Sequence, residues 1–141
     1  MAEKSLPVRH LYKITLETGG IPTMMPGAPQ GTRMIIGVKG GTFEGEKLNG
    51  TVADPGGDWV TQRADGSIKL DVRLTLKTDD DAMILVTYNG IGVVVDGELK
   101  ARCAPIFETG DERYAWLNNI QAVGIGGLNG TDVVYDIYEL L

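Results

Sequence analysis

The chain has 141 residues, a single cysteine, a single histidine and a formal net charge of −6. One domain spanning 1–141 is expected at this length. The negative charge argues against binding to nucleic-acid phosphates or to an anionic membrane surface. One cysteine excludes an internal disulfide and a multi-cysteine zinc site. Because no apolar run approaches the length of a membrane span, a cytoplasmic protein is expected.

The N-terminal third predicts a flexible start, one strand and a long loop. Residues 1–10 are expected to be flexible, and alternation of Tyr12, Ile14 and Leu16 with polar residues predicts a strand over 11–17. Residues 19–31 carry three prolines and predict a long irregular loop. Met24 and Met25 lie within it, so a flexible apolar lid over a pocket is the functional alternative.

The middle of the chain predicts a series of short strands separated by glycine-rich turns. Strands are predicted over 33–39, 58–63, 68–77 and 82–88, with short extended pieces between 42 and 53. The segment 68–77 is the clearest, because apolar and polar residues alternate along its whole length. Its polar face carries Asp71 and Arg73 two residues apart, so their side chains lie side by side.

The C-terminal third predicts strands over 91–95, 98–107, 117–125 and 132–140, with one short helical turn near 110–116. The whole pattern predicts an all-β domain of about eight to ten short strands, either a closed antiparallel barrel or a sandwich. The succession of hairpins along the chain favours a single up-and-down barrel. Glycine makes up 20 of the 141 residues, about twice its usual share, which fits many short strands joined by tight turns.

Two groups of residues are candidates for function. Asp71 and Arg73 form either a solvent-exposed ion pair or a desolvated pair that lines the barrel lumen, and strand parity cannot choose between the two. The second group is aromatic or polar, and its members are either core residues or the wall of a pocket. It consists of Phe43, Trp59, Tyr88, Tyr114, Trp116 and Asn118, of which the last three share a face if the segment is extended.

Five motifs in order resemble a known protein family. They are GGTFEG at 40–45, GGDW at 56–59, LDVRLTLKTDD at 70–80, FETGD at 107–111 and RYAWLN at 113–118. Together they resemble the domain of unknown function 3237 family, also called UPF0311, over most of the chain. The resemblance implies a single antiparallel up-and-down β-barrel of about eight strands, lipocalin-like in outline, and no settled activity. One departure is Asp81, which stands where the family usually has glycine.

The resemblance favours a lumen into which Asp71, Arg73 and Glu108 point together with the aromatic group. We therefore expect a cofactor-independent lyase, isomerase or cyclase acting on a small apolar or aromatic metabolite. Asp71 or Glu108 would move a proton, and Arg73 would hold the developing oxyanion with Tyr88 or Asn118. The alternatives are a barrel that only binds a small molecule, and a structural or assembly protein. No cofactor or metal is expected, and a homodimer is one expectation for the assembly.

Overall fold

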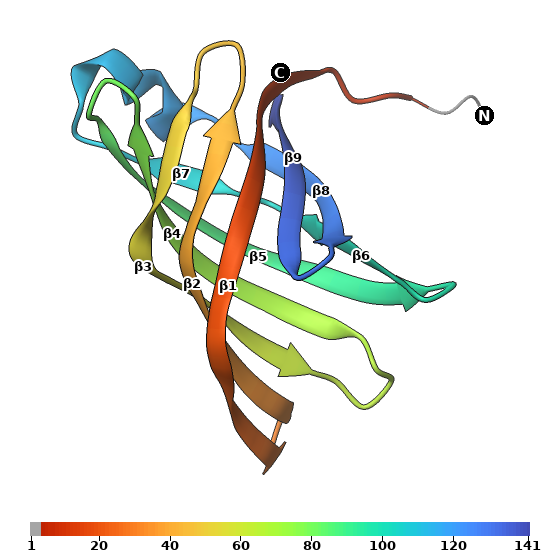
Figure 1. The fold of residues 1–141 in the computed structure, drawn as a ribbon. Coiled ribbons are helices and arrows are strands. Elements are labelled where there is room, and N and C mark those ends of the chain that lie inside the picture. The colour runs from red at the N-terminus through yellow and green to blue at the C-terminus, as the bar shows by residue number, and fades with distance from the viewer. Residues whose placement is uncertain (1–3) are drawn as a thin grey trace.

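The computed structural model describes residues 4–141, and within that range it contains nine strands and one 3-10 helix. The strands follow one another along the chain with the helix between the seventh and eighth (Figure 1). The elements are β1 (Val8–Ala28), β2 (Gly31–Glu44), β3 (Gly50–Gln62), β4 (Ile68–Thr78), β5 (Met83–Val95), β6 (Glu98–Cys103), β7 (Ile106–Glu108), η1 (Glu112–Asn119), β8 (Ala122–Asn129) and β9 (Asp132–Leu140).

The strands form one closed antiparallel barrel. The order is β4-β3-β2-β1-β9-β8-β6-β5-β7, and pairing of β4 with β5 closes eight strands into a ring. The short β7 is an additional strand that pairs with the first half of β5, whereas β6 pairs with the second half. Closure leaves no exposed edges in the eight-stranded ring. The predicted all-β barrel with one short helical segment is therefore confirmed.

Strand β4 shows why the sequence folds this way. Leu70, Val72, Leu74 and Leu76 are all buried, whereas the residues between them are exposed or half-buried. Two-residue periodicity places the apolar set on the inner face of the barrel and the polar set outside. Burial of each aliphatic side chain contributes about 1.5–3 kcal/mol to folding, so the pattern fixes which face is inside.

The two ends of the barrel differ. Helix η1 lies at the same end as the start of β1 and the end of β9, and we call this the capped end (Figure 1). Leu117 of η1 is completely buried there. The opposite end, which we call the open end, carries the β3–β4, β5–β6 and β8–β9 turns. The hairpin of β1 and β2 extends beyond this end (Figure 1).

Several predicted boundaries are wrong. The strands expected over 82–88 and 91–95 form the single strand β5, and the strand expected over 98–107 is divided into β6 and β7. Residues 19–28 are not an irregular loop but the second half of β1, which pairs with β2. Pro22 and Pro26 lie at shifts in the register of this pairing, where neither has to donate a hydrogen bond to β2. Strand β1 begins at Val8, inside the expected flexible segment 1–10, of which residues 1–3 lie outside the described chain. The expected strand 117–125 begins only at Ala122, because η1 continues to Asn119.

No helix among the described residues is long and apolar enough to cross a membrane.

Candidate functional site

The structure places Asp71 and Arg73 on the outer surface of the barrel. Both belong to the polar face of β4, where Arg73 is exposed and Asp71 half-buried. The expectation that this pair faces the lumen is therefore wrong. The physical reason is that Leu70, Val72 and Leu74 occupy the inner face of the same strand. The guanidinium of Arg73 instead lies over the ring of Trp59 on the neighbouring strand, 5.9 Å from its centroid.

Several predicted residues do gather, but along the outside of the barrel. Three adjoining depressions run across β3, β4, β5 and β7. Arg73, Leu85, Thr87 and Ile106 each line two of the three. The predicted residues that line one or another of them are Asp71, Arg73, Trp59, Tyr88, Glu108 and Asn118. This surface brings the predicted acid–guanidinium pair and Glu108 to one side of the molecule, in contact with solvent.

The remaining predicted residues are dispersed. Phe43 is buried in the core, with its ring edge-on to Tyr12. Tyr114 donates a hydrogen bond to the carboxylate of Asp80, and Asn118 exchanges two hydrogen bonds with the backbone of Thr109. Because η1 is helical, these residues do not share a strand face with Trp116, contrary to the extended alternative.

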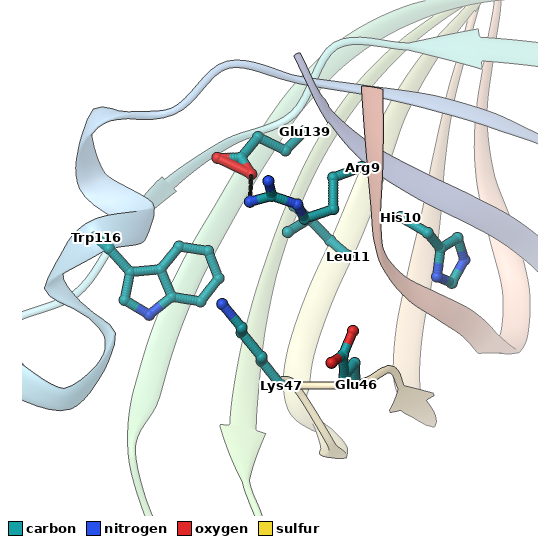
Figure 2. A pocket seen from close by; sticks show the side chains of 7 residues that line it. All are labelled: Arg9, His10, Leu11, Glu46, Lys47, Trp116 and Glu139. Carbon is teal, nitrogen blue, oxygen red and sulfur yellow. Dashed lines mark ion pairs between the residues drawn. The ribbon is translucent and has the colours of Figure 1, made fainter. Parts of the chain in front are cut away.

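Trp116 lines a separate cavity of about 200 Å³ at the capped end. Figure 2 shows its indole ring facing the ammonium group of Lys47, with the guanidinium of Arg9 nearby. The ammonium nitrogen lies 5.8 Å from the ring centroid. This cavity is distinct from the outer depressions, since the two share no lining residue.

The inner face of the barrel carries a carboxylate that the sequence analysis did not single out. Asp58 of β3 pairs with Ile36 of β2 and with Val72 of β4. Val60 lies two residues further along β3, on the same face as Asp58, and is buried. Gly56 lies two residues before Asp58 and also faces inward, because a Cβ placed on it would meet the side chains of Leu74 and Val38. Asp58 therefore points into the barrel interior, among apolar neighbours.

Burial changes the acidity of this carboxyl group. Asp58 is half-buried, and desolvation raises its pKa to about 6 from an ordinary 3.8. The backbone N–H of Asp71 donates to Oδ1 at 3.0 Å and opposes that shift, while the negative charge of the Asp71 carboxylate adds to it. A carboxyl group with a pKa near neutrality can both accept and donate a proton at physiological pH.

Two tyrosines lie on the same inner surface. Tyr88 of β5 pairs with Val72, and its ring meets Tyr135 of β9 edge-on with 5.7 Å between centroids. Burial raises the pKa of both hydroxyls, and the carboxylate of Asp58 raises them further. Burial likewise raises the pKa of the Cys103 thiol, to about 12. Both phenols are therefore neutral hydrogen-bond donors beside an acid that titrates near pH 6.

Solvent reaches this part of the inner face. Four apolar side chains pack against the core here but are only partly buried: Met34, Ile36, Ile68 and Val133. On the same inner face nearer the capped end, the apolar side chains are fully buried. The surface therefore combines partly exposed apolar side chains with a few polar groups, which is the usual lining of a small-molecule site. We call the set of Asp58, Tyr88, Tyr135 and these four apolar residues the inner site.

Glycines shape the inner site. A Cβ placed on Gly124 would overlap the sulfur of Cys103, and one on Gly126 would overlap the ring of Tyr135. A Cβ placed on Gly92 would overlap Ile68. The strands therefore omit side chains at these inward positions so that neighbouring rings and thiol can lie against the backbone.

A partial signal for Asp58 was present in the sequence. The residue lies in the GGDW motif and shares strand parity with the buried Val52 and Val60, although Asp54 and Gln62 share that parity as well. A charged residue on the apolar face of a strand is uncommon and therefore informative. Tyr88 is the one predicted ligand-binding residue that belongs to the inner site.

A family model described as "Protein of unknown function (DUF3237)" matches residues 7–140, which confirms the resemblance carried by the five motifs. A UPF0311 protein of Rhodopseudomonas palustris is 30% identical over 97% of this chain and 98% of its own length. The hydroalkoxylation enzyme phnH of Penicillium herquei is 38% identical over a shorter stretch, 60% of this chain and 51% of that protein.

Solved structures share the architecture. A β-barrel-like protein from Acinetobacter baumannii superimposes with a TM-score of 0.92 at 28% identity, covering 99% of both chains. A conserved protein of unknown function from Rhodopseudomonas palustris superimposes with a TM-score of 0.89 at 29% identity, over 99% of this chain and all of that one. The barrel is therefore a fold common to these proteins.

Proposed function

This chain belongs to the DUF3237 family, and we propose that it is an enzyme that binds a small apolar or aromatic metabolite inside the barrel and rearranges it by proton transfer. The reaction class is that of a lyase, isomerase or cyclase, and no bound cofactor takes part. The inner site replaces the outer pair of Asp71 and Arg73 as the proposed place of reaction. The observation that carries the proposal is the inward carboxyl of Asp58, whose pKa is raised to about 6.

Each part of the inner site has a role in this proposal. Apolar side chains such as Met34 and Ile36 bind the substrate by removing its apolar surface from water. Asp58 transfers the proton as general acid and base. The hydroxyls of Tyr88 and Tyr135 donate hydrogen bonds to a substrate oxygen on which negative charge develops. The N–H of Asp71 fixes the carboxyl at 3.0 Å, so that it need not reorganise during the reaction.

The name of one relative supports this class of reaction. Hydroalkoxylation adds the O–H bond of an alcohol or phenol across a carbon–carbon double bond: the O–H bond and the π bond break, a C–O bond forms at one carbon, and a proton is delivered to the other. In an intramolecular case the product is an isomer of the substrate, and no electrons are gained or lost overall. One carboxyl group can deliver the proton to carbon and recover a proton from the hydroxyl, which leaves the protein unchanged.

The reaction can be tested with 2-allylphenol, a phenol that cyclises by this addition. In D₂O each turnover places one carbon-bound deuterium in the cyclic product, and mass spectrometry detects the extra mass unit. We expect Asp58→Asn to lower the initial rate by about 10²-fold or more, because the amide neither accepts nor donates the proton. Asparagine keeps an oxygen that can accept the hydrogen bond from Asp71, so the variant is expected to fold.

Asp71→Asn is the matched control, since it is the same substitution on the neighbouring strand with the side chain outside the barrel. It should leave the rate within about twofold, apart from the small effect of removing a charge near Asp58. A large loss in Asp71→Asn with none in Asp58→Asn would move the reaction to the outer surface. Saturable binding of 2-allylphenol and other alkenyl phenols with no deuterium incorporation would instead support a barrel that only binds.

A further inference from the structure

The cavity at the capped end has the composition of a second binding site. Its volume is about 200 Å³, and it is formed where β1, β9, the β2–β3 loop and η1 meet. Figure 2 shows charged groups from three of these segments around one indole ring. The residues that carry the argument are Trp116, Lys47, Arg9, Glu46, Glu139 and Leu11.

An apolar surface forms one wall of the cavity. Trp116 is 36% exposed, so part of its indole ring is accessible to a ligand. Leu11 is buried and contributes apolar contact from β1. An exposed indole face offers a flat ligand ring a stacking partner, and the nearby ammonium of Lys47 shows that one cation already lies close to that face.

Charges of both signs surround the same space, and most of their bonding capacity is unused. The guanidinium of Arg9 approaches Glu139 at 3.7 Å through one nitrogen, which leaves its other donors available. Among residues 4–141, Lys47 and Glu46 take part in no ion pair. His10 also lines the cavity, but its imidazole is hydrogen-bonded to Asp136. The other charged groups of the lining are two cations and two carboxylates, so a simple anion or cation would meet repulsion as well as attraction.

We propose that this cavity binds a small zwitterion with a flat apolar group, of the chemical class of an aromatic α-amino acid. The ring lies against Trp116, the carboxylate is held by Lys47 and Arg9, and the ammonium group by Glu46. A ligand that carries both charges satisfies both halves of the lining, whereas a ligand with one charge leaves the opposite pair unmatched. The site is separate from the inner site, and the proposal does not depend on catalysis there.

The test uses three probes that share a phenyl group and differ in charge: L-phenylalanine, 3-phenylpropanoate and phenethylamine. The protein has two tryptophans, so in a Trp59→Phe background the emission reports Trp116 alone. We expect a saturable change in emission with phenylalanine, and binding about tenfold or more weaker for each singly charged probe, because each loses one charged hydrogen bond.

Charge variants identify the two halves of the site. Lys47→Gln should weaken the binding of phenylalanine and 3-phenylpropanoate, whereas that of phenethylamine should stay the same or become tighter because a repelling charge is removed. Glu46→Gln should weaken the binding of phenylalanine and phenethylamine, whereas that of 3-phenylpropanoate should stay the same or become tighter. Lys77→Gln, on the outer face of β4, is the matched control and should change none of them. Equal binding of all three probes, no saturable binding of phenylalanine, or 3-phenylpropanoate binding as tightly as phenylalanine would each overturn the proposal.

Discussion

The capped half and the open half of the barrel interior are built on the same eight strands but are filled differently. In the capped half Tyr12 packs edge-on against Phe43 and Phe107, with centroids 5.8 and 6.3 Å apart, and Leu117 completes the packing. In the open half a carboxyl group, two phenols and several inward glycines replace that packing. One half of a small barrel can therefore supply stability while the other half carries polar groups that lower it.

The largest expected difference concerns aliphatic truncation. Leu117→Ala removes a completely buried side chain at the capped end and should lower the free energy of unfolding by about 2–5 kcal/mol. Met34→Ala at the open end removes a side chain that is only partly buried, and should lower it by less than about 1.5 kcal/mol. Urea denaturation of both variants measures the difference, and equal losses would contradict the division into two halves.

A second prediction concerns the space that a glycine leaves for a ring. Gly126→Ala places a methyl group against the Tyr135 ring and the Val134 carbonyl oxygen, so backbone as well as side chain must shift. We expect a loss of about 1–3 kcal/mol and displaced NMR resonances of the Tyr135 ring. Gly110→Ala is the control, because its Cβ meets nothing within 4 Å and its backbone is not left-handed.

The third prediction concerns the pH dependence of stability. The folded protein keeps the Asp58 proton up to a pKa of about 6, whereas the unfolded chain releases it near 3.8. Stability therefore falls as pH rises through this window, because the native state binds more protons there. Asp58→Asn should remove that fall and be more stable than the wild type at pH 8, by about 2 kcal/mol after allowance for partial exposure.

Denaturation of both proteins at several pH values between 4 and 8 tests this prediction. If the wild type and Asp58→Asn lose stability in parallel over that range, the carboxyl is not desolvated in the folded state. Asp71→Asn should keep most of the pH dependence of the wild type, because desolvation of Asp58 is the main cause of its raised pKa and the Asp71 charge is a smaller one.

The smallest expected effect lies outside both halves, in the β4–β5 turn. Asp81 has a φ of 70°, in the left-handed region that glycine adopts without strain. Asp81→Gly should therefore raise the free energy of unfolding by about 0.5–1 kcal/mol, despite loss of an exposed ion pair with Lys77. Asp79→Gly, in the same turn without a positive φ, should not stabilise, and thermal unfolding of the two distinguishes them.

The alternation of apolar and polar residues along the strands favoured the barrel correctly. The family resemblance led us to expect Asp71 and Arg73 in the lumen, which is wrong. The apolar series in β4 already indicated which face was buried, and the expectation of a polar lumen placed Asp71 and Arg73 on the wrong side of it. In β3 the parity that Asp58 shares with Val60 is also that of Asp54 and Gln62, so this strand's own sequence does not single Asp58 out. Its pairing with Val72, on the apolar face of β4, identifies Asp58 as inward.

Other features depend on contacts that a single sequence does not reveal. The prolines in 19–28 are tolerated because they lie at register shifts, which only the pairing with β2 defines. The helical conformation of 112–119 is stabilised by an N-cap at Asp111 and by burial of Leu117 under the barrel end. The raised pKa of Asp58 requires apolar neighbours from strands far apart in the chain.

Pairing of β1 with β9 has a consequence for how the protein folds. The contact joins residues such as His10 and Asp136, separated by 126 positions, with 3.0 Å between Nε2 and Oδ1. Strands that follow one another along the chain can pair early as local hairpins, but the barrel cannot close until the final strand has been synthesised. Such long-range closure favours slow folding, on the millisecond-to-second scale of other β-rich domains. Both proposed sites include residues of β9, so both are completed only at that last step.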